Sequence, residues 1–282
     1  MQRTLRLRAV LLGAPIVLAA CGDTSQITTG PGSRNASPMG PNVQAYDKSF
    51  KTRDDVQIVR ATGDIKAAVS QYTALLGLPN NLAAVGDKGD GHREINWDAA
   101  VVPTNNNAFP GNFFNVNSPR GVVFTTDGTG FRVSNNGYTD VNPNYVGEFN
   151  TFSPPKLFVA VGSTTIDIQF FVAGSNTPAV VTGFGSVFAD VGRAHSTTIE
   201  YFDAAGNSLL KVAAPRRSDD NGLSFLGAKF ASAIVARVRI VAGDTPIGAD
   251  NNDNVTGAGQ KHDIVATDDF FYGEPHAITI DR

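Results

Sequence analysis

The chain has only one cysteine, Cys21, among its 282 residues. A single cysteine cannot form an internal disulfide, so the sequence excludes a disulfide-stapled scaffold. The four histidines are far apart and include no H-x-x-x-H pair, which argues against a zinc site. The sequence also lacks the G-x-S-x-G motif of serine hydrolases and the G-x-x-x-x-G-K-[ST] loop that binds nucleotide phosphates. No motif therefore indicates a catalytic residue.

Long apolar runs are scarce as well, and the one that stands out is residues 9–20, preceded by Arg3, Arg6 and Arg8. A basic segment followed by a short apolar run is typical of a secretory signal. The run is too short to remain as a membrane-spanning helix. We therefore expect the chain to be exported.

The signal-like segment ends in "LAAC", whose last residue is Cys21. This tetrapeptide resembles the lipobox of bacterial lipoproteins, a family in which the signal is cut before the cysteine, which then carries acyl chains on its sulfur and its amine. The resemblance implies a signal peptide at residues 1–20 and a lipid anchor on Cys21, because two or more acyl chains hold a protein stably at a membrane. Gly22 follows instead of Asp, which by the same resemblance favours the outer membrane or the cell surface. The alternative is an ordinary signal peptide with an incidental cysteine.

An excess of positive charge is also missing. The chain has 23 Lys and Arg against 26 Asp and Glu, and loss of residues 1–20 with their three arginines changes the net charge from −3 to −6. Nucleic acids require clustered cations, so we expect no nucleic-acid partner. Residues 21–41 are rich in Gly, Ser, Thr and Pro, a composition that predicts a flexible tether.

One helix is expected, within an N-terminal segment at residues 42–91. Thr62 is its expected N-cap, and Gly77 with Pro79 is the expected stop. The apolar residues at helical spacing are Ile65, Val69, Tyr72 and Leu76.

Alternation of period two predicts strands over residues 92–282. "TTIDIQFF" and "ARVRIVAG" alternate apolar and polar residues, while "TTIEYFDAAGNSLLKVAAP" and "GVVFTTDGTGFRVS" each read as two strands joined by a turn. The 29 glycines fit many turns. The sequence therefore predicts an all-β fold, a single antiparallel β-sandwich domain with the N-terminal helix packed beside it.

Several motifs carry a family resemblance. "GFGSVFADV", "LSFLGAKF" and "DIVATDDFFYGEP" resemble the jelly-roll module of exported bacterial proteins, among the carbohydrate-binding-module-like and MAM-like β-sandwiches. "HREINWD", "FFNVNSPRGVVFTT" and "FSPPKLFVAVGS" resemble a family of secreted bacterial proteins that carries all these motifs in this order, and the likeness covers about residues 60–275. The resemblance to jelly-roll modules implies a jelly-roll fold. In such modules one structural calcium ion is often held by an acid of the last strand.

By that likeness the metal ligands are Asp268 or Asp269, with Asp190 as their partner. The loop "GADNNDN", with Asp250 and Asp253, invites the same interpretation, since calcium takes six to eight oxygen ligands. The alternative is that Asp268 and Asp269 accept backbone N–H bonds at a strand start, while the loop acids form turns.

The stretch "HREINWD" contains the only tryptophan. Alternation places Trp97 on an apolar face as core, and Glu94 and Asp98 on the other face, on the order of 13 Å apart. Glycosidase carboxylate pairs lie closer, so a hydrolase would need an acid from elsewhere in the chain. We expect Arg93 or Arg120 to form structural ion pairs with Glu94 or Asp98.

The loop "NNNAFPGNFFNVNSP" holds Phe109, Phe113 and Phe114 among asparagines. Rings of this kind stack on sugars while amides bind the hydroxyls, so the three are candidate ligand-binding residues. The alternative is that they plug one end of the sandwich.

The leading hypothesis is a non-catalytic extracytoplasmic module, tethered to a membrane through its lipid and binding a glycan or another surface component. A second hypothesis is a polysaccharide hydrolase that uses Glu94 or Asp98 with a distant acid. A third is a purely structural envelope or adhesion protein.

Overall fold

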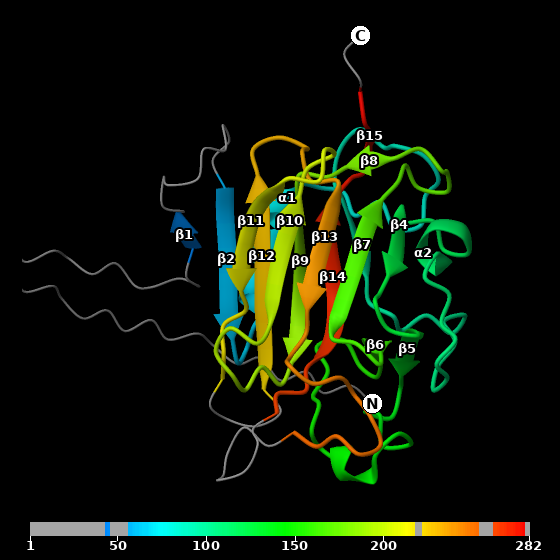
Figure 1. Ribbon diagram of the computed structural model, residues 1–282. Helices are drawn as coiled ribbons and strands as arrows, with labels where there is room; N and C mark the ends of the chain where they lie inside the picture. The colour runs from blue at the N-terminus through cyan, green and yellow to red at the C-terminus, as the bar shows by residue number, and fades with distance from the viewer. Residues whose placement is uncertain (1–42, 46–55, 218–221, 254–261, 280–282) are drawn as a thin grey trace, which may run out of the picture. The chain divides into compact units, whose positions relative to one another are not determined.

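Two antiparallel sheets dominate the computed structural model, which describes residues 43–45, 56–217, 222–253 and 262–279 (Figure 1). The eight-stranded sheet consists, in spatial order, of β1 (Val43–Ala45), β2 (Val56–Thr62), β12 (Leu223–Phe230), β9 (Gly183–Ala189), β14 (Ala266–Gly273), β6 (Leu157–Val161) and β5 (Gly130–Ser134), with β3 (His92–Ile95) also paired to β14. The five-stranded sheet consists of β11 (Ser208–Ala213), β10 (Thr198–Phe202), β13 (Arg237–Val241), β7 (Thr165–Phe170) and β4 (Val122–Thr125). The remaining elements are α1 (Lys66–Leu76), α2 (Phe113–Val116), a 3-10 turn η1 (Pro143–Tyr145) and the short pair β8 (Ala179–Val180) and β15 (His276–Ala277).

The main core lies between the two sheets. Alternate residues of β7, such as Ile166 and Ile168, point inward, as do Phe270 and Tyr272 from β14 on the facing sheet. Burial of these side chains removes apolar surface from water, the main favourable contribution to folding. The prediction of an antiparallel all-β sandwich is confirmed, while the jelly-roll connectivity stays a prediction.

Helix α1 packs on the outer face of the eight-stranded sheet and confirms the predicted helix. Its buried residues are Ala68, Val69, Tyr72 and Leu76. The predicted cap was wrong, because Thr62 belongs to β2 and the helix begins after Ile65 without a side-chain cap. Since β2 lies inside the large sheet, the segment at residues 42–91 and the strands after it share one sheet, within a compact unit that spans Met39–Arg282.

The predicted hairpin over "GVVFTTDGTGFRVS" was also wrong. β4 pairs with β7 in one sheet, whereas β5 pairs with β6 in the other, so the connection crosses the sandwich. At the crossing Gly128 lies against the backbone of Val161, too close for any side chain. A turn-rich sequence between two strands does not specify whether they pair with each other.

No helix among the residues described here is long and apolar enough to cross a membrane.

The Tyr72 ring of α1 packs against the sheet at two positions where only glycine leaves enough room. A Cβ added at Gly227 would lie 2.7 Å from the Tyr72 ring, and one at Gly185 would be equally close. The Tyr72 hydroxyl donates to the carbonyl of Ala228 at 2.9 Å. The position of the helix therefore depends on direct packing of the Tyr72 ring against the backbone of Gly185 and Gly227.

We expect Gly227→Ala to lower the free energy of unfolding by about 1–3 kcal/mol, because the added methyl overpacks this contact. Urea unfolding would measure it. In a Tyr72→Ala background the added methyl has room, so Gly227→Ala should lower the free energy of unfolding by less. An equal loss in both backgrounds would contradict this contact.

Candidate functional site

Three carboxylates converge just beyond the end of β9. One oxygen from each of Glu148, Asp190 and Asp253 lies within 4.8 Å of the others, and we call this set the rim cluster. Asp190 directly follows β9 and is buried, with its backbone N–H donating to the carbonyl of Gly222 at 2.9 Å. Asp253 accepts a hydrogen bond from the backbone N–H of Ile264 at 2.8 Å.

The loops that carry Glu148 and Asp253 are tied together by polar contacts. Asn142 donates from its amide to the carbonyl of Asn251 at 2.8 Å, and Asn144 donates to the side-chain oxygen of Asn252 at 2.9 Å. The Tyr145 hydroxyl donates to the same Asn251 carbonyl at 2.8 Å. The result is a rim of amides on the two loops that carry Glu148 and Asp253.

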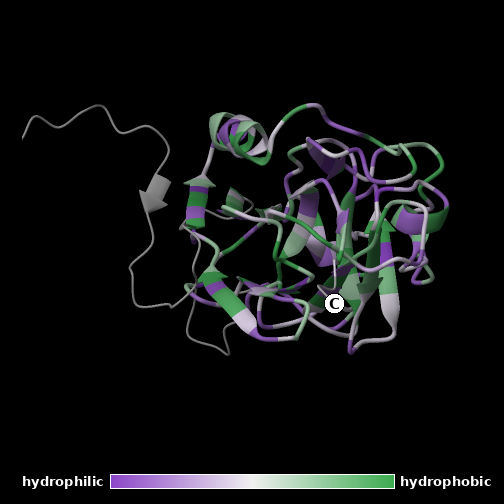
Figure 2. Cartoon of the chain, turned by 90° about the horizontal axis from the view of Figure 1, so that it is seen from above, coloured by the Kyte–Doolittle hydropathy of each residue, from purple (hydrophilic) through white to green (hydrophobic). Residues whose placement is uncertain are grey.

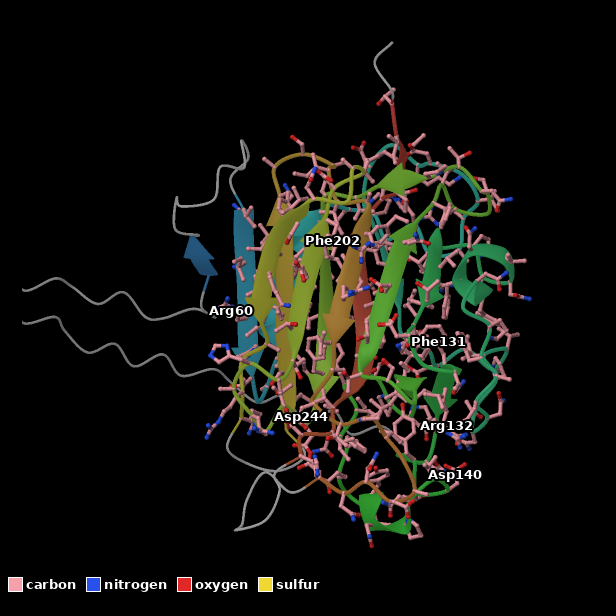
Figure 3. The ribbon with its side chains drawn as sticks, viewed as in Figure 1. Arg60, Phe131, Arg132, Asp140, Phe202 and Asp244 are labelled. Carbon is pink, nitrogen blue, oxygen red and sulfur yellow. The ribbon has the colours of Figure 1, made fainter. Side chains whose placement is uncertain are left out.

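Further carboxylates lie at this end of the sandwich. Asp140 and Asp244 lie among the same end loops (Figure 3), each paired with an arginine, Arg132 and Arg193 respectively. Nearby, burial raises the pKa of Asp263, whose carboxylate accepts the backbone N–H of Gly192 at 2.8 Å.

Burial, together with the charges of Asp253 and Glu148, raises the pKa of Asp190 to about 8. Three converging carboxylates repel one another unless a proton or a cation compensates them. Oxygen donors of this kind suit a hard cation such as Ca²⁺, whose six to eight ligands commonly include loop carbonyls and water. The donor set therefore fits calcium in chemical type, with Glu148, Asp190 and Asp253 as the residues that would hold it.

The rim cluster includes one of the predicted metal ligands, Asp190, but neither Asp268 nor Asp269. Asp253 comes from the loop whose acids had invited a calcium interpretation. Glu148 was missed, since a single acid in "NYVGEFN" carries no spacing signal that links it to residues more than 40 positions away.

Asp268 and Asp269 form a second, separate feature, which we call the aspartate pair. They occupy an irregularity in β14, where the register to β9 shifts between Thr267 and Phe270. Asp268 accepts the backbone N–H of Phe152 at 2.6 Å, and Asp269 accepts the hydroxyl of Ser153 at 2.5 Å. Asp268 thus accepts a backbone N–H, as the alternative proposed, but it does so within β14 and not at the start of the strand.

The two carboxyls of the pair are buried and hydrogen-bonded to each other. Burial and the charge of Asp269 raise the pKa of Asp268 to about 9. Burial also raises the pKa of Asp269, to about 6, against the lowering effect of the Ser153 hydroxyl. Both carboxyls therefore hold a proton more readily than an exposed aspartate does.

Trp97 is core, as predicted. Its ring stacks on Phe158 with centroids 4.1 Å apart, and its indole N–H donates to the carbonyl of Asp268 at 2.8 Å. Trp97 has left the strand, with φ of 63°, immediately after β3 ends at Ile95.

The aromatic loop needs a correction. Phe109, Phe113 and Phe114 are only 4%, 6% and 3% exposed and belong to the main core, where Phe109 and Phe114 pack edge-on against Trp97. Rings this deeply buried offer no stacking platform for a sugar. Burying the three phenylalanines removes more apolar surface from water than exposing them would, so they act as core side chains.

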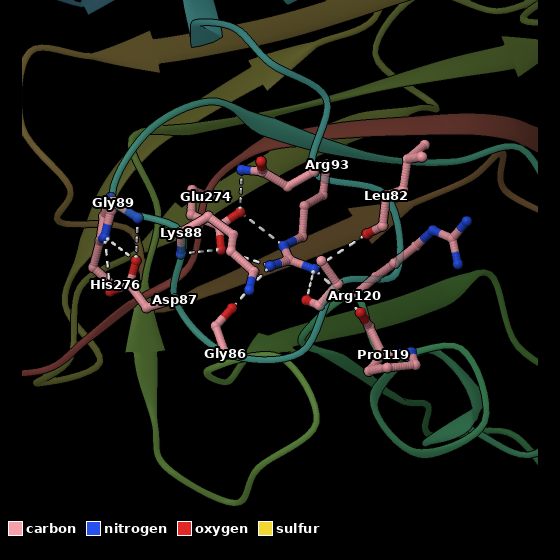
Figure 4. Close-up of polar contacts among 12 residues, drawn as sticks. Leu82, Gly86, Asp87, Lys88, Gly89, Arg93, Pro119, Arg120, Glu274 and His276 are labelled. Atoms are coloured by element: carbon pink, nitrogen blue, oxygen red, sulfur yellow. Dashed lines mark hydrogen bonds and ion pairs between the residues drawn. The ribbon is translucent and has the colours of Figure 1, made fainter.

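The predicted ion pairs also need a correction, because Arg93 pairs with Glu274. Both side chains are buried, and two guanidinium nitrogens contact the carboxylate at 2.8 and 2.6 Å (Figure 4). The remaining donors bind backbone carbonyls of two loops, at Leu82, Ala84, Gly86 and Pro119.

The other predicted members of those pairs find different partners. Arg120 donates to the backbone carbonyl of Glu94 at 2.8 Å, not to a carboxylate. The Glu94 side chain lies 3.1 Å from His92, and Asp98 accepts the backbone N–H of Lys156 at 3.3 Å. No pairing of an arginine with Glu94 or Asp98 occurs among the ion pairs of the described residues.

The fold and these sites define the class: an antiparallel β-sandwich with an acidic rim at one end and a buried aspartate pair on its large sheet. No family model matches the chain, and no curated protein matches it.

The aspartate pair predicts how stability depends on pH. Carboxyls whose folded pKa is raised keep their protons after the unfolded chain has lost them, at about pH 4. Stability without metal should therefore fall as pH rises from about 4, with Asp269 contributing up to about pH 6, Asp190 up to about 8 and Asp268 up to about 9.

Asp268→Asn removes the most strongly raised group, so urea midpoints measured in chelator at pH 5, 7 and 9 should fall less steeply than in the wild type. The matched control is Asp203→Asn, whose pKa is lowered by hydrogen bonds within its own turn, despite slight burial, and which titrates below this window. A variant slope identical to the wild type would show that Asp268 is already ionised at neutral pH.

Proposed function

We propose that this protein is an exported lipoprotein, anchored through Cys21, whose β-sandwich binds a glycan or another cell-surface component without catalysis. The basic and apolar N-terminal segment followed by "LAAC" supports export and lipidation. The observation that carries the binding proposal is the rim cluster, in which three loop carboxylates converge among asparagine amides.

A calcium ion in the rim cluster would join three separate loops. Glu148 follows η1, Asp190 follows β9, and Asp253 lies between β13 and β14. Binding a cation there stabilises the folded chain by mass action and holds the amide rim in one arrangement. Because the predicted phenylalanine platform is buried, the proposed contacts to ligand hydroxyls come from the amides and the cation at this rim.

The hydrolase hypothesis gains no support from the aspartate pair. The charges of Asp98 and Glu94 act on Asp269, but Asp268 is fully buried and Asp269 is only 5% exposed. Carboxyls this deeply buried do not come within hydrogen-bond reach of a polysaccharide chain.

The calcium proposal predicts a higher melting temperature with calcium. At a free concentration 100 times Kd, the bound ion should add about 2.7 kcal/mol to the free energy of unfolding, and chelator should remove the gain. Asp190→Asn should abolish the response, whereas Asp250→Asn, an exposed acid next to the same loop amides, should retain it. Equal responses in the two variants would place the ion elsewhere.

The binding proposal predicts retention of the full chain on a glycan array in calcium and its loss in chelator. Glu148→Gln should lose retention to the same extent as chelator, with Glu200→Gln on β10 as the control. Failure to bind any cell-wall or environmental glycan would contradict the glycan proposal.

A further inference from the structure

Exposed apolar side chains gather at the end of the sandwich opposite the rim cluster. Six large hydrophobic residues are exposed in the part of the chain that the structure describes. Four belong to this end, with exposed fractions of 75%, 60%, 62% and 64%, and we call them the apolar end: Leu78, Leu82, Val85 and Val116.

The strand register shows that the two features lie at opposite ends. Ala189 pairs with Ala266, so Asp190 lies where β14 begins. Arg93 binds Glu274, which follows the last residue of β14, and the same guanidinium binds the Leu82 carbonyl. β14 has eight residues, so the two ends are separated by roughly 26 Å.

Contacts join the loops of the apolar end into one surface. Arg93 binds carbonyls on both sides of Val85 and also the carbonyl of Pro119, three residues after Val116. The Val85 methyls pack beside Gly174, and the backbone N–H of Gly174 donates to Asn115, the neighbour of Val116. The loops that carry Leu82, Val85 and Val116 are thus joined to one another. Figure 2 looks onto this end and shows hydrophobic stretches in the loops that surround it.

We propose that the apolar end docks on the lipid surface to which Cys21 is anchored, so that the rim cluster faces away from the membrane. This inference rests on the proposed lipidation of Cys21. Between Cys21 and Val43 the chain has 22 steps, which span at most about 80 Å, so its length alone permits either end to meet the membrane. Apolar surface at one end selects the orientation, because its transfer into the lipid interface is favourable.

The charges near the apolar end argue for a hydrophobic contact. Asp87, Lys88 and Asp90 lie in the same loop and sum to one negative charge, and Asp87 contacts His276 at 3.0 Å. Arg120, next to Pro119, adds one positive charge, and the described residues of this end include no cluster of cations that would attract anionic headgroups. Docking should therefore occur on neutral phosphatidylcholine and persist at high salt.

The test uses full-length acylated protein in phosphatidylcholine vesicles that contain nitroxide-labelled lipid. In acylated protein the Cys21 sulfur is already bonded to its lipid, so an introduced cysteine is the only reactive thiol. A fluorophore is attached at Leu78→Cys or, as control, at Val146→Cys, because both positions are 75% exposed. Val146 follows η1 in the loops around the rim cluster.

Quenching by the nitroxide lipid should be on the order of threefold or more stronger for Leu78→Cys than for Val146→Cys, since only the former reaches the interface. Adding Leu82→Asp and Val85→Asp should abolish the difference, while adding Val101→Asp should preserve it, because Val101 is equally exposed but lies outside the apolar end.

Equal quenching at the two labelled positions, or quenching lost at high salt, would overturn the docking proposal alone. Mass spectrometry of the same sample separates this from failure of the anchor. An unacylated Cys21 would overturn the lipoprotein proposal and the docking inference with it.

Discussion

The buried contact between Arg93 and Glu274 is the constraint on which the arrangement of this protein depends. A guanidinium removed from water is costly unless all its donors are satisfied. Here two nitrogens contact one carboxylate, and the rest bind carbonyls from two loops. The planar, multidentate geometry of arginine allows one side chain to organise this much backbone, which a lysine could not do.

This contact positions the chain around one of the two candidate sites. It holds β3 against β14, and so brings Glu94 and Asp98 near the aspartate pair. It also holds the loops around Leu82 and Pro119 at one end of the sandwich, whereas the rim cluster lies at the other end. The two ends of the sandwich therefore differ in chemical character, with exposed apolar side chains at one end and carboxylates at the other.

Local patterns in the sequence predicted local structure well. The helix over Lys66–Leu76 and the hairpin of β10 and β11 follow directly from spacing and turn residues. Prediction failed where the partner is distant: β4 and β5 look like a hairpin but join different sheets, and Glu274 lies 181 residues from Arg93. No period or motif encodes such a pairing.

For the candidate sites, too, the local features were predictable and the contacts between distant residues were not. Asp190 and the loop of Asp253 were recognisable as acidic positions, but their convergence with Glu148 depends on three loops meeting at a sheet end. Phe109, Phe113 and Phe114 were misleading because their asparagine neighbours suggest exposure, whereas the rings turn into the main core.

Hydrogen exchange in a Glu274→Gln variant tests the central claim most directly, with Glu94→Gln, a half-exposed acid of the same strand region, as control. Loss of the charge partner should destabilise the fold by about 3–5 kcal/mol. It should also speed exchange of the backbone amides of residues 79–92, including Lys88, which donates to Glu274. Exchange in this loop as slow in Glu274→Gln as in Glu94→Gln would contradict the account.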